Sequence, residues 1–379
     1  MDRGAGGPLQ HAPHDGERTA EELAPATAPG AGTRSEPLTA AALRVLDQVP
    51  AEWDALVAAD DSASPSHQPL VWAAFAAAFP GFEWRLLASY EGGALAAGVP
   101  VVIARRGPFR WLHALPWMLS AAPLARAGAH AAADRMLATA FAALAQREQV
   151  VGGEWACYRP GVEPVGEDAL SAVPGNTRWV ETALLPVEHG LDACRAAMGR
   201  KARQTLEQAG ERGLVFAEEP AALDEAYALH VAQSRHWPGH RPLPIELSRR
   251  LLAARANGVP VARLFTLRSG HGLESATLVL DGAHETLAWW AGTHPGGRRL
   301  QAFTLLMWRV AEWATQHGRR RLNLGASTGL EGVSAFKRSL GADIVRYPVR
   351  VLDARHAGWA GRALALAQSA RRRRAGGRA

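Results

Sequence analysis

The sequence has few cysteines. Only Cys157 and Cys194 occur among 379 residues, and they share no CxxC or ligand-like spacing. The sequence therefore predicts neither a disulfide framework nor a zinc site. The 14 histidines are scattered without HxH or HExxH spacing, so we expect no metal. Free cysteines suit a reducing compartment, and we expect a cytoplasmic protein.

Long apolar runs are also missing. The uncharged stretches at residues 92–104 and 111–125 contain proline and fall short of the roughly 20 residues that a membrane helix needs. Residues 1–38 lack the apolar core of a signal peptide, so we do not expect one. They are rich in Ala, Gly and Pro and poor in large apolar side chains, which predicts a disordered leader.

Positive charge outside the C-terminus is limited. The formal net charge is +6, and the arginines at 371–374 and 378 account for most of it. The remaining chain is close to neutral, which does not favour a nucleic-acid-binding surface, and we expect no DNA partner. The basic tail, residues 356–379, is predicted to be solvated, with contact to an anionic surface as the alternative.

The residues in between show the same order of elements twice. The first half has strand patterns at 84–90 and 96–104, a helix at 131–146 and a strand at 153–159. The second half has strand patterns at 260–268, 274–280 and 285–293, with a hairpin signal at Asp281-Gly282. A helix at 300–317, ended by Gly318, and a strand at 321–325 follow. The sequence predicts two copies of one α/β module.

A glycine-rich loop precedes the second helix. "THPGGRRLQAF", residues 293–303, would place Gly296 and Gly297 at a helix N-terminus, where backbone N–H groups favour an anion. Arg298 and Arg299 add charge suited to phosphate, and we assign these four residues to cofactor binding. An ordinary loop with solvated arginines is the alternative.

The sequence does not indicate catalysis by a covalent nucleophile. The sequence offers no convincing Ser-His-Asp or Cys-His arrangement, and "GASTG" around Ser327 is not a G-x-S-x-G elbow. A reaction without a covalent nucleophile can rely on proximity, a proton route and stabilisation of developing charge. His294, Glu331 and Tyr347 flank the expected cleft and are the catalytic candidates.

The order of meander, glycine loop, helix and strand resembles the GNAT N-acyltransferase fold. The stretch "NLGASTGLEGVSAFKRSLGA", residues 323–342, is similar to the closing segment of its FemAB-like and BioF2-like branch. The matching residues are Asn323, Gly325, Ser327, Phe336, Lys337 and Gly341. "GRKARQTLEQAGERGL" at 199–214 and "PSHQPLVWAAF" at 65–75 resemble the openings of the second and first domains. The resemblance covers about residues 40–350.

This sequence also departs from the family. Asn323 stands where an acidic residue is common, and residues 297–302 are a degenerate version of the acetyl-CoA signature. The fold that the resemblance implies is α/β, with two tandem GNAT-like domains, each a mixed, mostly antiparallel sheet flanked by helices. The predicted boundaries are 39–180 for the first domain and 181–355 for the second.

The implied activity is direct acyl transfer from acyl-CoA or acetyl-CoA to an amine. The expected acceptor is a sugar, a cell-envelope or polysaccharide precursor, or another small molecule. The second interpretation is an aminoacyl-tRNA-dependent transferase of the FemAB kind, with tRNA as partner. The third is a non-catalytic GNAT-like binding module in polysaccharide biosynthesis.

The resemblance also implies substrate-binding residues. Lys337 would neutralise an anionic group, with a solvated lysine as the alternative, and Ser327, Gln68 and Trp72 would contact the substrate. Trp289 and Trp290 are neighbours in a predicted strand, so we expect their rings on opposite faces of the sheet. Trp290 is then expected to line the acceptor cleft, with packing against a helix as the alternative.

Overall fold

The computed structural model describes residues 36–37, 43–115, 119–161, 165–237, 241–327 and 330–352. The predicted basic tail lies outside these residues, and so does the predicted leader except for β1 (Glu36–Pro37), which pairs with β2. None of the described helices has the length and apolar character needed to cross a bilayer.

The first half of the chain alternates strands and helices around one crossover helix, α3. In order its elements are β2 (Leu43–Leu46), α1 (Trp53–Ala59), η1 (Pro65–His67), α2 (Pro69–Ala78), β3 (Phe82–Glu91), β4 (Ala94–Arg106), β5 (Phe109–His113), β6 (Leu124–Ala125), α3 (His130–Arg147), β7 (Gly153–Ala156), α4 (Glu167–Ser171) and β8 (Asn176–Pro186).

The second half repeats this plan around the crossover helix α10. Its elements are α5 (Leu191–Ala197), α6 (Arg200–Gly210), β9 (Val215–Glu218), η2 (Pro220–Ala222), α7 (Leu223–Ser234), α8 (Ile245–Ala253), β10 (Arg255–Ala256), β11 (Val259–Pro260), β12 (Ala262–Ser269), β13 (Gly272–Asp281), β14 (Glu285–Thr293), α9 (Pro295–Arg299), α10 (Ala302–Gln316), β15 (Arg321–Asn323), α11 (Glu331–Ser339) and β16 (Asp343–Leu352). The predicted hairpin at Asp281-Gly282 joins β13 to β14.

The strands of both halves join in a single sheet. Within the described residues it has 14 strands in the order β1-β2-β3-β4-β5-β7-β16-β8-β15-β14-β13-β12-β9, with β6 paired to β4. All pairs are antiparallel except β5 with β7 and β14 with β15. The predicted mixed, mostly antiparallel α/β fold is confirmed.

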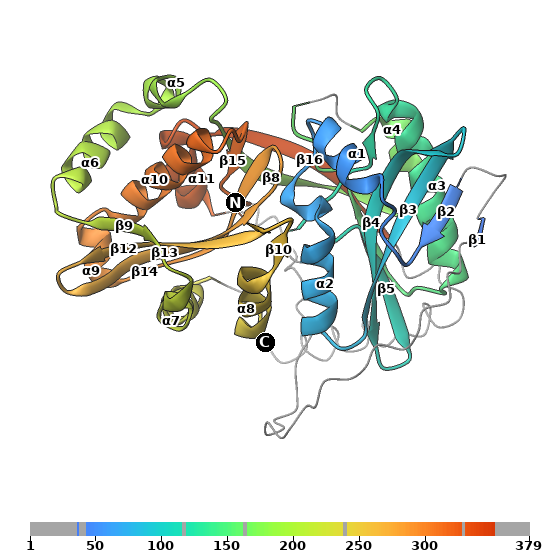
Figure 1. Ribbon diagram of the computed structural model, residues 1–379, viewed down its shortest axis with the longest axis horizontal. Coiled ribbons are helices and arrows are strands. Elements are labelled where there is room, and N and C mark those ends of the chain that lie inside the picture. Colours follow the sequence, from blue (N-terminus) through green and yellow to red (C-terminus); the bar gives the residue numbers. More distant parts are fainter. Residues whose placement is uncertain are drawn as a thin grey trace, which may run out of the picture.

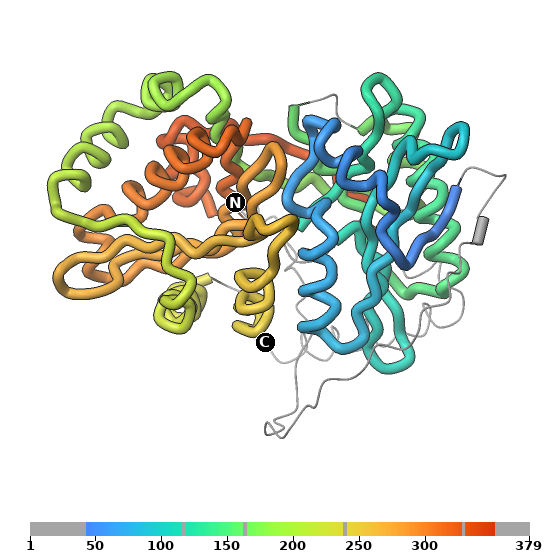
Figure 2. Tube along the Cα trace, viewed as in Figure 1, coloured from blue at the N-terminus to red at the C-terminus, as the bar shows by residue number. Residues whose placement is uncertain are grey.

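The last strand of each half pairs with the other half. Strand β8 pairs with β15 of the second half, β16 pairs with β7 of the first half, and β8 and β16 pair with each other. Figure 2 shows the red β16 running from the second half toward the first. The boundary predicted between residues 180 and 181 lies inside β8 and stays a prediction.

Helices cover both faces of the second half. Helix α10 packs over β12 and β13 with a core that includes Leu306, Val310 and Ala311, all fully buried. Helices α7 and α8 pack against the same strands with the other large core cluster, because strand residues alternate between the two faces. Helix α8 lies beside α2 of the first half, where the two halves meet (Figure 1).

Strand β14 breaks the alternation expected for the two tryptophans. Leu278 pairs with Trp290 but Val279 pairs with Ala288, so Trp289 is the extra residue of a β-bulge. Trp289 packs on Phe75 of α2 with ring centroids 5.9 Å apart, and Trp290 donates to Ser248 of α8 at 3.2 Å. Both rings therefore lie in the same helix layer, and the prediction of opposite faces is wrong because of the bulge.

Candidate active site

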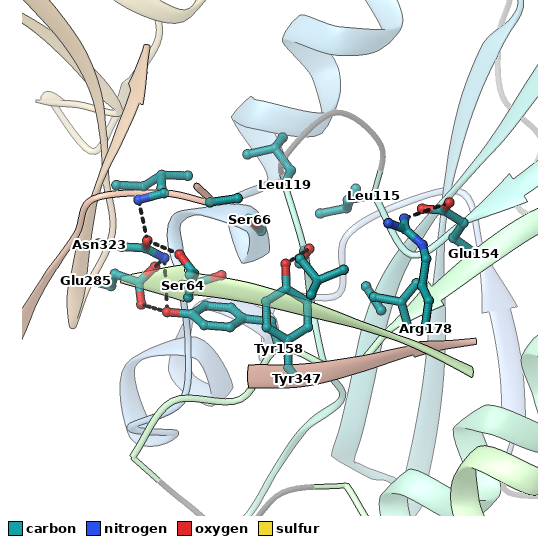
Figure 3. A pocket seen from close by; sticks show the side chains of 18 residues that line it. Ser64, Ser66, Leu115, Leu119, Glu154, Tyr158, Arg178, Glu285, Asn323 and Tyr347 are labelled. Atoms are coloured by element: carbon teal, nitrogen blue, oxygen red, sulfur yellow. Dashed lines mark hydrogen bonds and ion pairs between the residues drawn. The ribbon is translucent and has the colours of Figure 1, made fainter. Parts of the chain in front are cut away.

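A cavity of about 150 Å³ lies where the two halves share the sheet. Its polar side chains come from β7, β8, β14, β15, β16 and the segment around η1 (Figure 3). The lining residues are Ser64, Ser66, Leu115, Leu119, Ser120, Glu154, Ala156, Tyr158, Arg178, Val180, Thr182, Glu285, Leu287, Asn323, Gly325, Ala326, Tyr347 and Val349.

Asn323 organises one end of the cavity. Its Nδ2 donates to the hydroxyl of Tyr158 and to Glu285 Oε1, both at 3.0 Å. Its Oδ1 accepts from Thr182 Oγ1 at 2.6 Å and from the backbone N–H of Gly325 at 2.8 Å. The amide uses both donors and two acceptor positions, so it is fixed in place.

Glu285 is a buried carboxylate whose charge is balanced by an ion pair and hydrogen bonds. It is 1% exposed, and its Oε2 accepts from Tyr158 at 2.6 Å and from Arg321 Nε at 3.0 Å. Arg321 also donates to the carbonyl of Asp61 in the first half. The ion pair therefore connects the two halves, and three hydrogen bonds hold its carboxylate in place.

Two tyrosines form the middle of the cavity. The rings of Tyr158 and Tyr347 meet edge to face with centroids 5.2 Å apart (Figure 3). Burial, with the neighbouring charge of Glu285, holds the pKa of Tyr158 well above its usual range. Burial also raises the pKa of Tyr347, whose hydroxyl lies 3.3 Å from that of Ser120. Both phenols keep their protons at neutral pH.

The opposite end of the cavity carries an ion pair. Arg178 of β8 donates to Glu154 of β7 at 2.8 Å, and both side chains are partly exposed. This pair lies beyond the tyrosines from Asn323 in Figure 3. The cavity therefore has charged pairs at both ends, each neutral overall.

The segment around η1 closes the cavity from the first half. His67 is fully buried, accepts from the backbone N–H of Ser64 at 3.0 Å, and bonds the carbonyl of Ala122 at 3.0 Å. Burial lowers the pKa of His67, which keeps the imidazole neutral and able to accept. Trp72, 1% exposed, donates to the carbonyl of Ser66 at 2.7 Å.

Gln68 connects this segment to the second half. Its side-chain amide donates to the carbonyl of Asp281, at the end of β13. Gln68 and Trp72, both predicted to contact substrate, thus hold the segment that carries Ser64 and Ser66. Neither side chain lines the cavity.

Lys337 lies behind the cavity wall. It is 7% exposed and donates to the carbonyls of Gly325 and Ala326, both at 2.8 Å. Burial lowers its pKa to about 8. Its helix, α11, is anchored by Phe336, whose ring stacks on Phe303 with centroids 5.4 Å apart. The lysine is not the solvated side chain that was the alternative.

The loop before α10 is built on close backbone packing. A Cβ on Gly297 would lie 2.3 Å from the carbonyl oxygen of Glu274, so only glycine fits there. The backbone N–H of Gly296 donates to Nδ1 of His294 at 3.1 Å. Arg298 and Arg299 are exposed, and Arg212 donates to the carbonyl of Arg299.

Strand β14 loses its pairing with β15 next to the cavity. Only residues 285–287 pair with β15, because β15 ends at Asn323 and the chain turns away. Two backbone groups farther along β14 bond α7 instead. His230 Nδ1 bonds the carbonyl of Ala291, and Gln233 accepts from the N–H of Thr293, each at 3.0 Å.

The predicted site residues are spread over several places. Of the three catalytic candidates, Tyr347 lines the cavity, whereas His294 lies at the start of α9 and Glu331 is exposed in the first turn of α11. Ser327 is buried, and its carbonyl accepts from Leu330 at 2.8 Å. Trp290 packs against α7 and α8.

The sequence analysis did not find most of the lining residues. Tyr158, Glu285 and Thr182 stand in ordinary strand patterns, and Arg178 and Glu154 form a pair across two strands. The signal that could have found part of the site was Asn323, a polar residue that ends an apolar strand next to glycine.

Comparison with known families assigns part of the chain. Residues 194–338 match the family model described as an acetyltransferase (GNAT) domain. This part of the chain is therefore similar to a GNAT acetyltransferase domain. The matched stretch runs from α5 into α11 and includes the strands β14 and β15. The prediction of a GNAT-type transferase enzyme is confirmed at the level of this domain family.

Solved structures resemble the chain at low identity, and FemX shares its fold. FemX aligns with a TM-score of 0.64 and 13% identity, over 80% of this chain and 96% of FemX. A tandem GNAT protein from the clavulanic acid biosynthesis pathway aligns with a TM-score of 0.47 and 12% identity, over 80% and 94% of the two chains. A search of curated proteins found no match. The described residues contain no group of three or more His, Cys, Asp or Glu side chains that could hold a metal.

Proposed function

We propose that the protein is an N-acyltransferase that moves an acyl group directly from acyl-CoA to an amine bound in the cavity. The observation that carries this proposal is the divergence of β14 and β15 beside the cavity, in the matched GNAT domain. Divergence leaves a gap in the sheet through which a donor from the α10 side can meet an acceptor in the cavity. Such proximity supplies much of the rate acceleration in acyl transfer.

The donor phosphates are assigned to the start of α10. This helix has 15 residues, and its first N–H groups carry the positive end of the helix dipole. Gln301 precedes it with a φ of 57°, which turns the chain sharply into the helix. Arg298 and Arg299 are exposed beside this end, and Gly296 and Gly297 shape the loop. Phosphate groups fit this arrangement.

Tyr347 is the proposed proton donor. In the reaction, the amine nitrogen forms a bond to the acyl carbon, the carbon–sulfur bond breaks, and the leaving sulfur takes a proton. Tyr347 lines the cavity and keeps its proton because burial raises its pKa. The amine proton replaces the one that Tyr347 gives up, with the Ser120 hydroxyl 3.3 Å away as relay.

The acceptor is proposed to be a polar amine without net charge besides the amine. Hydroxyl groups of Ser64, Ser66, Ser120 and Thr182 line the cavity, and its two ion pairs are each neutral. Amines on sugars, on cell-envelope or polysaccharide precursors, or on other small molecules meet this description. We place the reaction in the cytoplasm, because the free cysteines Cys157 and Cys194 suit a reducing compartment.

Aminoacyl-tRNA is the second candidate donor. The observation in its favour is the likeness to FemX, which spans both halves of the chain rather than the GNAT domain alone. This candidate requires tRNA binding that weakens with salt. The two donors are therefore distinguishable by binding.

The test is a transfer assay with purified protein, labelled acetyl-CoA and longer acyl-CoAs, and a panel of amino sugars and small amines. We expect acyl transfer by the wild type and about a hundredfold lower kcat for Tyr347→Phe, because one proton-transfer group is lost. Tyr227→Phe, a tyrosine outside the cavity that bonds the carbonyl of Leu243, is the matched control and should keep its activity.

Two results would contradict this proposal. Absence of acyl-CoA binding, together with salt-sensitive binding of charged tRNA, would replace the donor. Equal activity of Tyr347→Phe and Tyr227→Phe would remove Tyr347 from proton transfer.

A further inference from the structure

We propose that Asn323 is a positioning residue, which fixes the Gly325–Ala326 wall of the cavity through a hydrogen-bonded pair with the carboxylate of Glu285. The inference rests on the proposed function, because it concerns the same cavity. It assigns a role to an amide that touches neither the proposed donor phosphates nor the proposed proton donor.

The contacts leave one orientation for the amide. The backbone N–H of Gly325 can only donate, so the atom 2.8 Å from it is the side-chain oxygen of Asn323. The other end then carries the NH₂ group, which faces Glu285 Oε1 at 3.0 Å. A residue at this position must accept on one side and donate on the other, which an amide does at every pH.

The backbone N–H and the carbonyl of Gly325 each bond a side chain. Its N–H bonds Asn323, and its carbonyl accepts from Lys337 at 2.8 Å. Gly325 has a φ of 74°, so the chain turns away from β14 at this residue. The backbone of Ala183 also bonds Leu324 and the carbonyl of Gly325, and Asn323 adds the side-chain contact to the N–H of Gly325 where the chain leaves the strand.

A carboxylate at position 323 would conflict with Glu285. Two carboxylates about 3 Å apart cannot both be ionised, so the pair would retain one proton to a raised pH. The charged or titratable groups around them are Tyr158 after β7, Arg321 on β15, Tyr347 on β16 and, through Gly325, Lys337 on α11. Arg321 is the cation in direct contact with Glu285, and its bond to Glu285 Oε2 leaves Oε1 to Asn323.

The test uses Asn323→Asp and the exchanged double variant Asn323→Asp/Glu285→Gln. At low pH the carboxyl introduced by Asn323→Asp is protonated, so its hydroxyl donates to Glu285 and its other oxygen accepts from Gly325. It has one donor hydrogen where the amide has two, so the bond to Tyr158 is lost and the variant should show a constant loss of stability against the wild type at low pH. As pH rises from the ordinary carboxyl range, we expect its urea midpoint to fall relative to the wild type, because the folded state retains a proton that the unfolded state releases.

Two comparisons isolate the pair. The double variant has one carboxylate and one amide again, and we expect it to recover the pH dependence of the wild type. Asn176→Asp makes the same chemical change at an exposed position of β8 and should show no such trend. An Asn323→Asp curve that matches Asn176→Asp, or a double variant that does not recover, would overturn the pairing.

The positioning role has its own readouts. Hydrogen-exchange mass spectrometry of the peptide 322–327 should show lost protection in Asn323→Asp at pH 8, and recovery in the double variant. Activity is measured with the acyl-CoA and amine that the wild type uses. The ratio of the kcat/KM of Asn323→Asp to that of the wild type should fall about tenfold between pH 6 and pH 8. An unchanged ratio, or unchanged protection, contradicts positioning.

The exchange experiment also separates the two proposals. If the wild type transfers no acyl group but the loop follows the predicted exchange pattern, the proposed function fails and the Asn323–Glu285 arrangement stands. If the wild type is active and the loop does not respond, only the arrangement fails.

Discussion

The two halves of the molecule share a framework but differ where their crossover helices begin. In each half, a meander leads through a crossover helix to a strand that pairs in parallel, β7 with β5 and β15 with β14. In the first half, Asp60 accepts from the N–H of Ala125 at 2.9 Å and from His130, the first residue of α3, at 3.0 Å. One turn farther, Asp134 forms a buried ion pair with Arg159.

In the second half a buried carboxylate, Glu274, lies 3.7 Å from His294 at the start of α9, whereas the described contacts place none at the start of α10. There the chain provides a short Pro-Gly-Gly helix, exposed arginines at 298 and 299, and Gln301 in the left-handed conformation. The first half therefore has its own carboxylates beside the start of its crossover helix, whereas the second half has arginines beside the start of α10, where we propose that the donor phosphates bind. The family match, which covers residues 194–338, falls on the half that contains α10.

The largest expected effect comes from breaking the internal pair of the first half. Asp134→Ala leaves the buried guanidinium of Arg159 without its carboxylate, and we expect the free energy of unfolding to fall by about 3–5 kcal/mol. Urea denaturation measures this change. Asp224→Ala removes an exposed partner of Arg249 and should cost less than about 1 kcal/mol.

A double variant supplies the control for Asp134→Ala. Asp134→Leu/Arg159→Met removes both charges, so most of the lost stability should return. Equal losses in Asp134→Ala and Asp224→Ala would mean that the pair does not hold the start of α3.

Each half contains a buried basic side chain with a lowered pKa, so the stability of the protein depends on pH over two separate ranges. Burial lowers the pKa of Lys337 from 10.5 to about 8, so the unfolded chain binds more protons between these values and stability rises with pH there. The shift corresponds to about 3 kcal/mol. In the first half, burial lowers the pKa of His113 from 6.5 to about 4, which places its rise between pH 4 and 6.5.

Urea titrations across pH measure both windows. The difference between the wild type and Lys337→Met should grow in favour of the wild type from pH 8 to 10.5, and that for His113→Gln from pH 4 to 6.5. A flat difference over its own window contradicts the burial of that base.

The smallest expected effect concerns donor binding. Reversing both charges with Arg298→Glu/Arg299→Glu should weaken acetyl-CoA binding about tenfold, because exposed charges act through screened solvent. Arg126→Glu/Arg135→Glu makes the same change near the start of α3 and should leave the affinity unchanged. Isothermal titration calorimetry at constant salt measures the acetyl-CoA affinity of both variants. Similar losses of affinity would mean that the arginines beside α10 do not bind the donor more specifically than those beside α3.

Local patterns were sufficient for much of the second half. The apolar spacing that ends at Gly318 predicted α10 as 300–317, and the structure has it at Ala302–Gln316. Asp281-Gly282 predicted the hairpin because turn chemistry is local. Such signals depend on neighbouring residues, which a single sequence contains.

The site depends on contacts that a single sequence does not contain. Glu285 opens a strand like many exposed acids, and only the register with β15 brings it to Arg321 and Asn323. The pairing of β8 and β16 with strands of the other half could not be predicted either. Alternation of apolar residues shows which face of a strand is buried but not which strand it pairs with. Trp290 was misplaced because a bulge adds one residue without a distinct sequence signal.

The exchanged strands also affect how the chain is made. Strand β7 is synthesised early, yet its partner β16 ends at Leu352, near the end of the described chain. While the ribosome adds the residues between them, the first half has an uncovered sheet edge, which is open to mispairing with other nascent chains. The protein can complete its first half only after its second half has been translated.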